Sequence, residues 1–189
     1  KPTMNLVGYD NSPEMISIAQ SNEVWANKPL SSGLMPWFVS DWSYIEMLLR
    51  TNKKRIALNL SSVIHEVYSY GNENNVNEFW NRVFNSGFDY IIIRDMLVSK
   101  NSDKDSKVKD VEKIQNAHIE NLAEFENVWG PISIQRNLLH YLLKYRYNKN
   151  WFRELRENYL PITLEEMLSK IPTEKYSYEL YEHYTLPFI

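Results

Sequence analysis

The chain has 189 residues, a formal net charge of −3 and 43% hydrophobic residues, which fits one globular domain or one domain with an insertion. It contains no cysteine, so disulfides, thiolate catalysis and zinc sites built on cysteine are excluded. The negative charge argues against a protein held on nucleic acid mainly by phosphate contacts. No segment approaches the ~20 apolar residues of a membrane span, and we expect a cytoplasmic protein.

The first predicted element is a short apolar strand over residues 4–9, which runs into Asp10. A helix is predicted over 12–22 because Ser12 is a good N-cap, Pro13 suits the first helical position, and Glu14 places negative charge at the positive end of the helix dipole. Asp10 is therefore expected at the carboxyl edge of a sheet, where the chain turns sharply.

Strands and helices then alternate along the first half of the chain. Strands are predicted over 34–41, 55–64 and 88–96, and helices over 42–50 and 75–86. This alternation is typical of a parallel sheet that is covered on both faces.

The second half has a different character. Residues 100–107 are charged or small and contain nothing apolar, which predicts a mobile loop. Helices are expected over about 109–125, 134–147, 153–159 and 163–171, and a late strand over 176–189. The predicted organisation is an α/β core over 1–99, a flexible loop and helical cover over 100–175, and a return to the core over 176–189.

Four segments together resemble the class I S-adenosylmethionine-dependent methyltransferases, read from their second strand onward. They are VGYDNSPEM at 7–15, VSDW at 39–42, LNLSSVIHEV at 58–67 and FDYIIIRD at 88–95. The resemblance lies in their order and spacing, and it covers the first half of the chain well and the second half in outline. It implies a Rossmann-like three-layer sandwich with a mostly parallel sheet and a helical insertion before the last strands.

The resemblance also implies roles for particular residues. Asp10, with Asn11 beside it, would hold the ribose of S-adenosylmethionine, and Asp41 and Trp42 would contact the adenine. The segment from Asn59 and Leu60 to residue 66 would pass the methionine part of the cofactor and face the methyl acceptor. The family's glycine-rich loop is absent from these residues, so the chain alone is expected to bind S-adenosylmethionine poorly or not at all and to transfer no methyl group.

Three of these cofactor residues have a plainer alternative. Asp10 suits a turn, Asp41 suits a helix N-cap, and Trp42 suits packing at the start of a helix.

His65 and Glu66 are the adjacent pair with acid-base capacity at the carboxyl end of a predicted strand, and either could take a proton from an acceptor. His65 could instead cap a helix. Tyr68 and Tyr70 follow on the same segment and could line an acceptor pocket. The other histidines show no ligand spacing with Asp or Glu, so no metal site is proposed.

The acceptor stays open between a small molecule and RNA. Residues 142–153 interleave basic and aromatic side chains, a composition that can contact RNA, although a solvated basic helix face explains it as well. Two other functions are compatible with the sequence. One is a non-catalytic, methyltransferase-like domain that binds a partner or a nucleotide. The other is a nicotinamide-dependent oxidoreductase, whose ribose Asp10 would equally suit.

Overall fold

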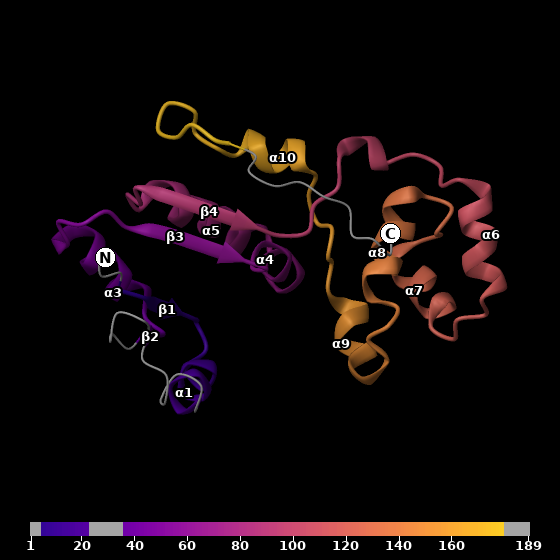
Figure 1. Ribbon diagram of the computed structural model, residues 1–189, viewed down its shortest axis with the longest axis horizontal. Helices are drawn as coiled ribbons and strands as arrows, with labels where there is room; N and C mark the ends of the chain where they lie inside the picture. The colour runs from indigo at the N-terminus through magenta and orange to yellow at the C-terminus, as the bar shows by residue number, and fades with distance from the viewer. Residues whose placement is uncertain (1–4, 23–35, 180–189) are drawn as a thin grey trace. The chain divides into compact units, whose positions relative to one another are not determined.

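The computed structural model describes residues 5–22 and 36–179 of the chain. The Cα packing divides the chain into two compact units, Lys1–Ile56 and Ala57–Ile189, and each is described by itself (Figure 1). This division differs from the predicted organisation, whose boundaries stay predictions.

The first unit is built on two short parallel strands. β1 (Val7–Tyr9) pairs with β2 (Trp37–Val39), and α1 (Pro13–Ser21) and α3 (Trp42–Thr51) follow the two strands. The Ser12 hydroxyl accepts a hydrogen bond from the Met15 N–H, which confirms the predicted start of α1. The first part of the strand predicted over 34–41 lies outside the described residues.

A second parallel pair opens the second unit. β3 (Ala57–Ser61) pairs with β4 (Tyr90–Arg94) over their full length, from Ala57 opposite Tyr90 to Ser61 opposite Arg94. The crossover between them holds α4 (Ile64–Tyr70) and α5 (Glu73–Asn85). The predicted strand over 55–64 is therefore shorter than expected, and its last residue begins α4.

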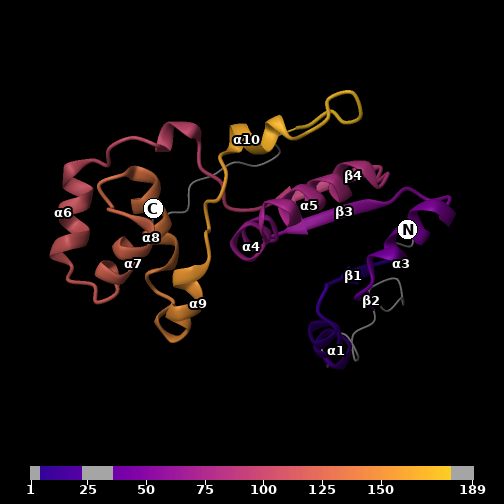
Figure 2. The same ribbon diagram turned by 180° about the vertical axis from the view of Figure 1, so that it is seen from behind.

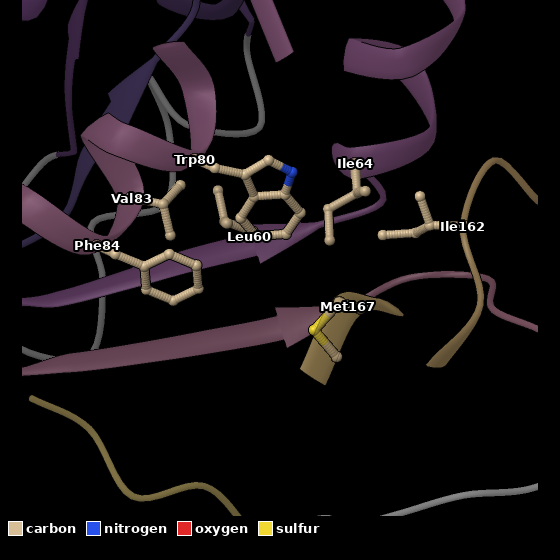
Figure 3. Packing of buried hydrophobic residues seen from close by; sticks show 7 residues of the cluster. All are labelled: Leu60, Ile64, Trp80, Val83, Phe84, Ile162 and Met167. Carbon is tan, nitrogen blue, oxygen red and sulfur yellow. The ribbon is translucent and has the colours of Figure 1, made fainter. Parts of the chain in front are cut away.

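The core of this unit lies between the β3–β4 sheet and α5. Its buried members come from β3, from the two crossover helices and from the chain around α10. Figure 3 shows how they pack: Leu60, Ile64, Trp80, Val83, Phe84, Ile162 and Met167. The rings of Trp80 and Phe84 stack at 5.5 Å between centroids. Side chains alternate along a strand, so Leu58 and Leu60 lie on the sheet face that packs against α5. The opposite, open face carries exposed residues, Asn59 and Ile92 among them.

Helices make up most of the remaining chain (Figure 2). They are η1 (Lys100–Ser102), α6 (Val108–Asn116), α7 (Leu122–Trp129), α8 (Gln135–Lys144), η2 (Asn148–Asn150), α9 (Trp151–Arg156) and α10 (Leu164–Ser169). A second buried cluster, centred on Phe125 and Tyr141, holds α7, α8 and α9 together.

Three expectations for this half need correction or refinement. The helix predicted over 109–125 is broken between α6 and α7, where His118 takes a left-handed φ of 48°. The loop at 100–107 contains η1 and is anchored through backbone hydrogen bonds of Ser106 to Ser133 and of Gln135 to Lys104; its mobility stays a prediction. Residues 176–179 are not a strand, and 180–189 lie outside the described residues.

The protein is thus mixed α/β, with two small parallel sheets.

Candidate functional site

A buried polar contact lies where β3 and β4 end. The imidazole Nδ1 of His65, near the start of α4, is 2.8 Å from Oδ1 of Asp95, the residue directly after β4. The side chain of His65 is 8% exposed and that of Asp95 is 1% exposed. Because β3 and β4 are parallel, their carboxyl ends meet at one edge of the sheet, and this brings together two residues 30 positions apart.

Backbone donors fix the Asp95 carboxylate in place. Oδ2 accepts the Ile64 N–H at 2.7 Å and Oδ1 accepts the Met96 N–H at 2.8 Å. Asp95 therefore serves as the cap of α4, since Val63 at the N-cap position makes no side-chain hydrogen bond. Burial alone would raise the pKa of Asp95, but the hydrogen bonds from His65, Met96 and Ile64 outweigh it and hold the pKa below its usual value.

The same contact acts on His65 in the opposite sense. The hydrogen bond to Asp95 raises the pKa of His65 above its ordinary value of 6.5. Burial works against this rise, and the negative charges of Asp95, Glu66 and Glu157 support it. The buried carboxylate therefore favours the protonated form of His65 and would hold the imidazolium once it forms.

A second carboxylate, Glu157, joins α4 to the end of α9. The Tyr70 hydroxyl and the Arg153 Nε both donate to Glu157 Oε1 at 2.7 Å. Arg153 also reaches Glu66, with its Nη2 at 3.5 Å from Oε1. Burial would raise the pKa of Glu157, but the hydrogen bonds from Tyr70 and Arg153 leave that pKa lowered. We call His65, Glu66, Tyr70, Asp95, Arg153 and Glu157 the α4 network.

Two further contacts tie residues 158 and 159 to α4. The Asn158 N–H donates to the Ser69 hydroxyl at 2.7 Å, and that hydroxyl donates to the His65 backbone oxygen at 2.7 Å. The Tyr159 ring lies edge-on to the His65 ring, with 5.4 Å between centroids. His65 is thus enclosed by α4, by Asp95 and by the segment after α9.

A buried lysine supports the segment that carries Glu157. Lys144, at the end of α8, is fully buried, and its Nζ donates to the backbone oxygens of Glu154 and Glu157 at 2.5 Å each. The ammonium also lies 4.7 Å from the centre of the Tyr159 ring, within reach of a cation–π interaction. Burial lowers the pKa of Lys144 to about 7, although the charges of Glu154 and Glu157 oppose the change.

The residues predicted for ribose and adenine lie in the first unit, and their local roles are clear. Asp10 Oδ1 accepts the Ser12 N–H at 2.8 Å, and Asp41 Oδ1 accepts the Ser43 N–H at 2.9 Å as the N-cap of α3. Both therefore have the turn and cap roles offered as alternatives. Because β1 and β2 are parallel, both also lie at the carboxyl edge of one sheet, as a shared ligand site requires.

The residues next to these two carboxylates, Trp42 and Asn11, also have a local structural role, and their ligand-binding role stays a prediction. Trp42 packs edge-on against Tyr9, with 5.1 Å between ring centroids, as expected for packing at a helix start. Asn11 is exposed at the turn. Their contact with a nucleoside stays a prediction.

The remaining predicted residues lie in the second unit. Asn59 is exposed on the open face of β3, whereas Leu60 is buried in the core, so that only its backbone could meet a ligand. The Tyr68 hydroxyl accepts a hydrogen bond from Trp80 Nε1 at 3.1 Å and faces the core cluster. Tyr70 is 61% exposed and belongs to the α4 network, so of the two tyrosines it is the one available to an acceptor.

An open pocket of about 440 Å³ lies on the segment between α8 and α9, and no residue of the α4 network lines it. It is lined by Arg146, Tyr147, Asn148, Lys149 and Asn150. These residues belong to the basic and aromatic stretch considered for RNA, and none is a predicted cofactor or catalytic residue. An RNA acceptor remains a prediction.

Sequence reasoning identified His65 and Glu66 but gave no role at this site to Asp95, Glu157, Arg153 or Lys144; the last two were considered only as part of the basic and aromatic stretch over 142–153. A signal existed for Asp95, which follows the strongest predicted strand. Arg153 and Glu157 form an i,i+4 pair, which is a local signal. Nothing local marks their contacts with Glu66 and Tyr70, which lie 87 residues away, or the burial of Lys144.

Comparison of the chain with protein-family models, with curated proteins and with solved structures finds no match. Within residues 5–22 and 36–179, no three His, Asp or Glu side chains are grouped so that they could hold a metal ion. No helix in the same part of the chain is long and apolar enough to cross a membrane.

Proposed function

We propose that the chain is part of a class I S-adenosylmethionine-dependent methyltransferase, with a Rossmann-like three-layer core and a helical insertion. The observation that carries the proposal is the placement of polar residues at the carboxyl ends of the parallel strands. Asp10 follows β1, Asp41 follows β2, and the His65–Asp95 pair lies after β3 and β4. Open α/β sheets bind ligands at the carboxyl ends of their strands, and each of the two sheets carries its polar residues there.

The residues at these strand ends suit the parts of the cofactor. Asp10 and Asp41 each spend one carboxylate oxygen, Oδ1, on the backbone hydrogen bond described above, and Oδ2 would accept from a ribose hydroxyl or an adenine amino group. Asn59 on the open face of β3 would donate to the methionine part. When bound, S-adenosylmethionine supplies an electrophilic methyl group.

The chemical role that we assign to His65 is to accept the proton that an acceptor oxygen or nitrogen loses when it gains the methyl group. Asp95 fixes the ring through Nδ1, which leaves Nε2 as the atom that takes the proton, and its charge stabilises the imidazolium that results. Glu66 and Tyr70 would position the acceptor from α4. Proximity and alignment supply the rest of the acceleration.

A non-catalytic binding domain is the second candidate, and the burial of His65 favours it. A base must reach its substrate, and a histidine with an 8% exposed side chain meets an acceptor only if the segment after α9 moves. In this alternative the His65–Asp95 pair stabilises the end of the sheet and has no part in chemistry.

The decisive test is a ligand titration of the 189-residue chain monitored by NMR, which also detects weak binding. S-adenosylhomocysteine at millimolar concentration is expected to shift the amide signals of Ser12 and Ser43, which report the Asp10 and Asp41 carboxylates. NAD, added in a matched titration, is expected to leave them unchanged. Shifts with NAD but not with S-adenosylhomocysteine would overturn the assignment.

A further inference from the structure

Arg94, the last residue of β4, has an unusual set of partners. Its Nε and Nη2 donate to the hydroxyl of Ser61 at 2.8 and 2.6 Å, and Nη2 also lies 3.5 Å from the hydroxyl of Ser62. Within the described part of the chain, no carboxylate lies at ion-pair distance from Arg94. Other described arginines do have one: Arg50, Arg82, Arg136 and Arg153.

The hydrogen bonds at Ser61 leave several donor protons without an acceptor in the described part of the chain. A hydroxyl has two acceptor lone pairs and one proton. Both lone pairs of the Ser61 oxygen are taken by Arg94, so this hydroxyl can only donate further. No acceptor for its proton, or for that of Ser62, lies within hydrogen-bond distance among the residues that the structure describes, and the Nη1 protons of Arg94 are likewise unused there.

The backbone holds these donors at one place. Ser61 and Arg94 are directly opposite in the parallel register, and the Ser62 N–H donates to the Arg94 backbone oxygen at 2.8 Å. Ser62 takes a left-handed φ of 58°, a strained conformation for a non-glycine residue. That conformation turns the chain from β3 into α4 and leaves Ser62 exposed beside Arg94.

We propose that Arg94, Ser61 and Ser62 form a binding site for an anionic group, a carboxylate or a phosphate, at the carboxyl ends of β3 and β4. The guanidinium supplies the charge, and the two neighbouring hydroxyls supply neutral donors for the same anion. The nearest carboxylate in sequence, Asp95, does not compete, because it is buried against Ile64 and His65. The site stands whether or not the chain transfers methyl groups.

The charges around the site agree with this assignment. Glu66 is directed to Arg153 rather than to Arg94, and the exposed face of the sheet carries Asn59, two residues before Ser61. A ligand held at Arg94 would therefore extend along the open face of β3 toward Asn59, over apolar surface that includes the exposed side chain of Ile92.

The test is an NMR titration of the 189-residue chain with inorganic phosphate, sodium acetate and sodium chloride at equal ionic strength. We expect saturable shifts of the Arg94 Nε–Hε signal and the Ser62 amide signal with phosphate, acetate or both. Saturation by phosphate alone identifies a phosphate ligand, and saturation by acetate alone identifies a carboxylate. Shifts that chloride reproduces, or that do not saturate, would overturn the site.

Variants make the test specific. R94Q should lower the affinity for the anion about tenfold to a hundredfold, and R94K should lower it less. S61A should lower the affinity without changing the charge of the site. R50Q is the matched control, because Arg50 is an exposed arginine paired with Glu46, and it should bind as the wild type does. An unchanged Ile64 amide signal shows that a variant keeps the Asp95 contact. Wild-type affinity in both R94Q and S61A would refute the proposal.

Discussion

The Asp95 carboxylate binds His65 and the Ile64 N–H at once, so one side chain both pairs with an imidazole and caps the helix that carries it. A helix cap normally comes from the residue just before the helix. Here it comes from 31 residues later in the chain. Asp95 thereby joins the end of β4 to the start of α4, and the pKa of His65 depends on this connection.

Asp95→Asn is expected to lower the pKa of His65, because burial then acts on the imidazole without its charged partner. A raised pKa in the folded state stabilises the wild type fully below pH 6.5, and this stabilisation is lost as the pH rises through the raised pKa. An NMR titration of the imidazole protons measures the shift. A midpoint equal to that of the wild type would show that Asp95 does not govern His65.

Lys144→Met is expected to change how stability depends on pH. The folded protein holds Lys144 with a pKa of about 7, whereas the unfolded chain keeps the ordinary value of 10.5. The unfolded state therefore binds more protons between these limits, and wild-type stability relative to the variant should rise with pH, by up to ~1.4 kcal/mol per unit. Denaturant unfolding of both proteins between pH 7.5 and 9.5 tests this sign. A constant difference would mean that Lys144 stays charged.

His118→Gly is expected to stabilise the protein by about 0.5–1 kcal/mol, because glycine takes the left-handed conformation after a helix without steric cost. His118 is exposed and has a φ of 48° just after α6. The melting temperature should rise by about 1–4 °C. His118→Ala is the control, since alanine keeps the strain, and an equal gain in both variants would remove the conformational explanation.

Asp10→Ala is expected to weaken S-adenosylhomocysteine binding by about 1.5–3 kcal/mol, the loss of charge-assisted hydrogen bonds. This prediction rests on the proposed function. Glu14→Ala is the matched control, because it removes an exposed carboxylate from the first turn of α1. The dissociation constants come from the NMR titration. Equal affinities in the two variants would leave Asp10 as a turn residue only.

The elements that could be predicted from the sequence are those whose determinants are local. Ser12 and Pro13 mark the start of α1, and Asp41 marks the start of α3, because a cap lies within three residues of the N–H that it binds. The break at His118 could not be predicted, because the apolar pattern continues on both sides of it.

The candidate site was predictable only in part, for a different reason. His65 and Glu66 stand out as an adjacent acid-base pair after a strand. Their partners Asp95 and Arg153 are chosen by tertiary structure, as is the burial of Lys144, a residue type that is almost always exposed. The pattern around Lys144 predicts a solvated helix face, and only the carbonyl oxygens at the end of α9 explain its position.

The hydrogen bond from Asn158 to Ser69 closes a loop of 89 residues, whereas that from Ile64 to Asp95 closes 31. The longer closure costs about 1 kcal/mol more in chain entropy, so the order of folding should follow the length of these loops. The strand pair with α4 and α5 should reach native contacts first, and the chain after α9 should dock onto it later. In pulse-labelling hydrogen exchange, the Ile64 amide would then gain protection before the Asn158 amide does.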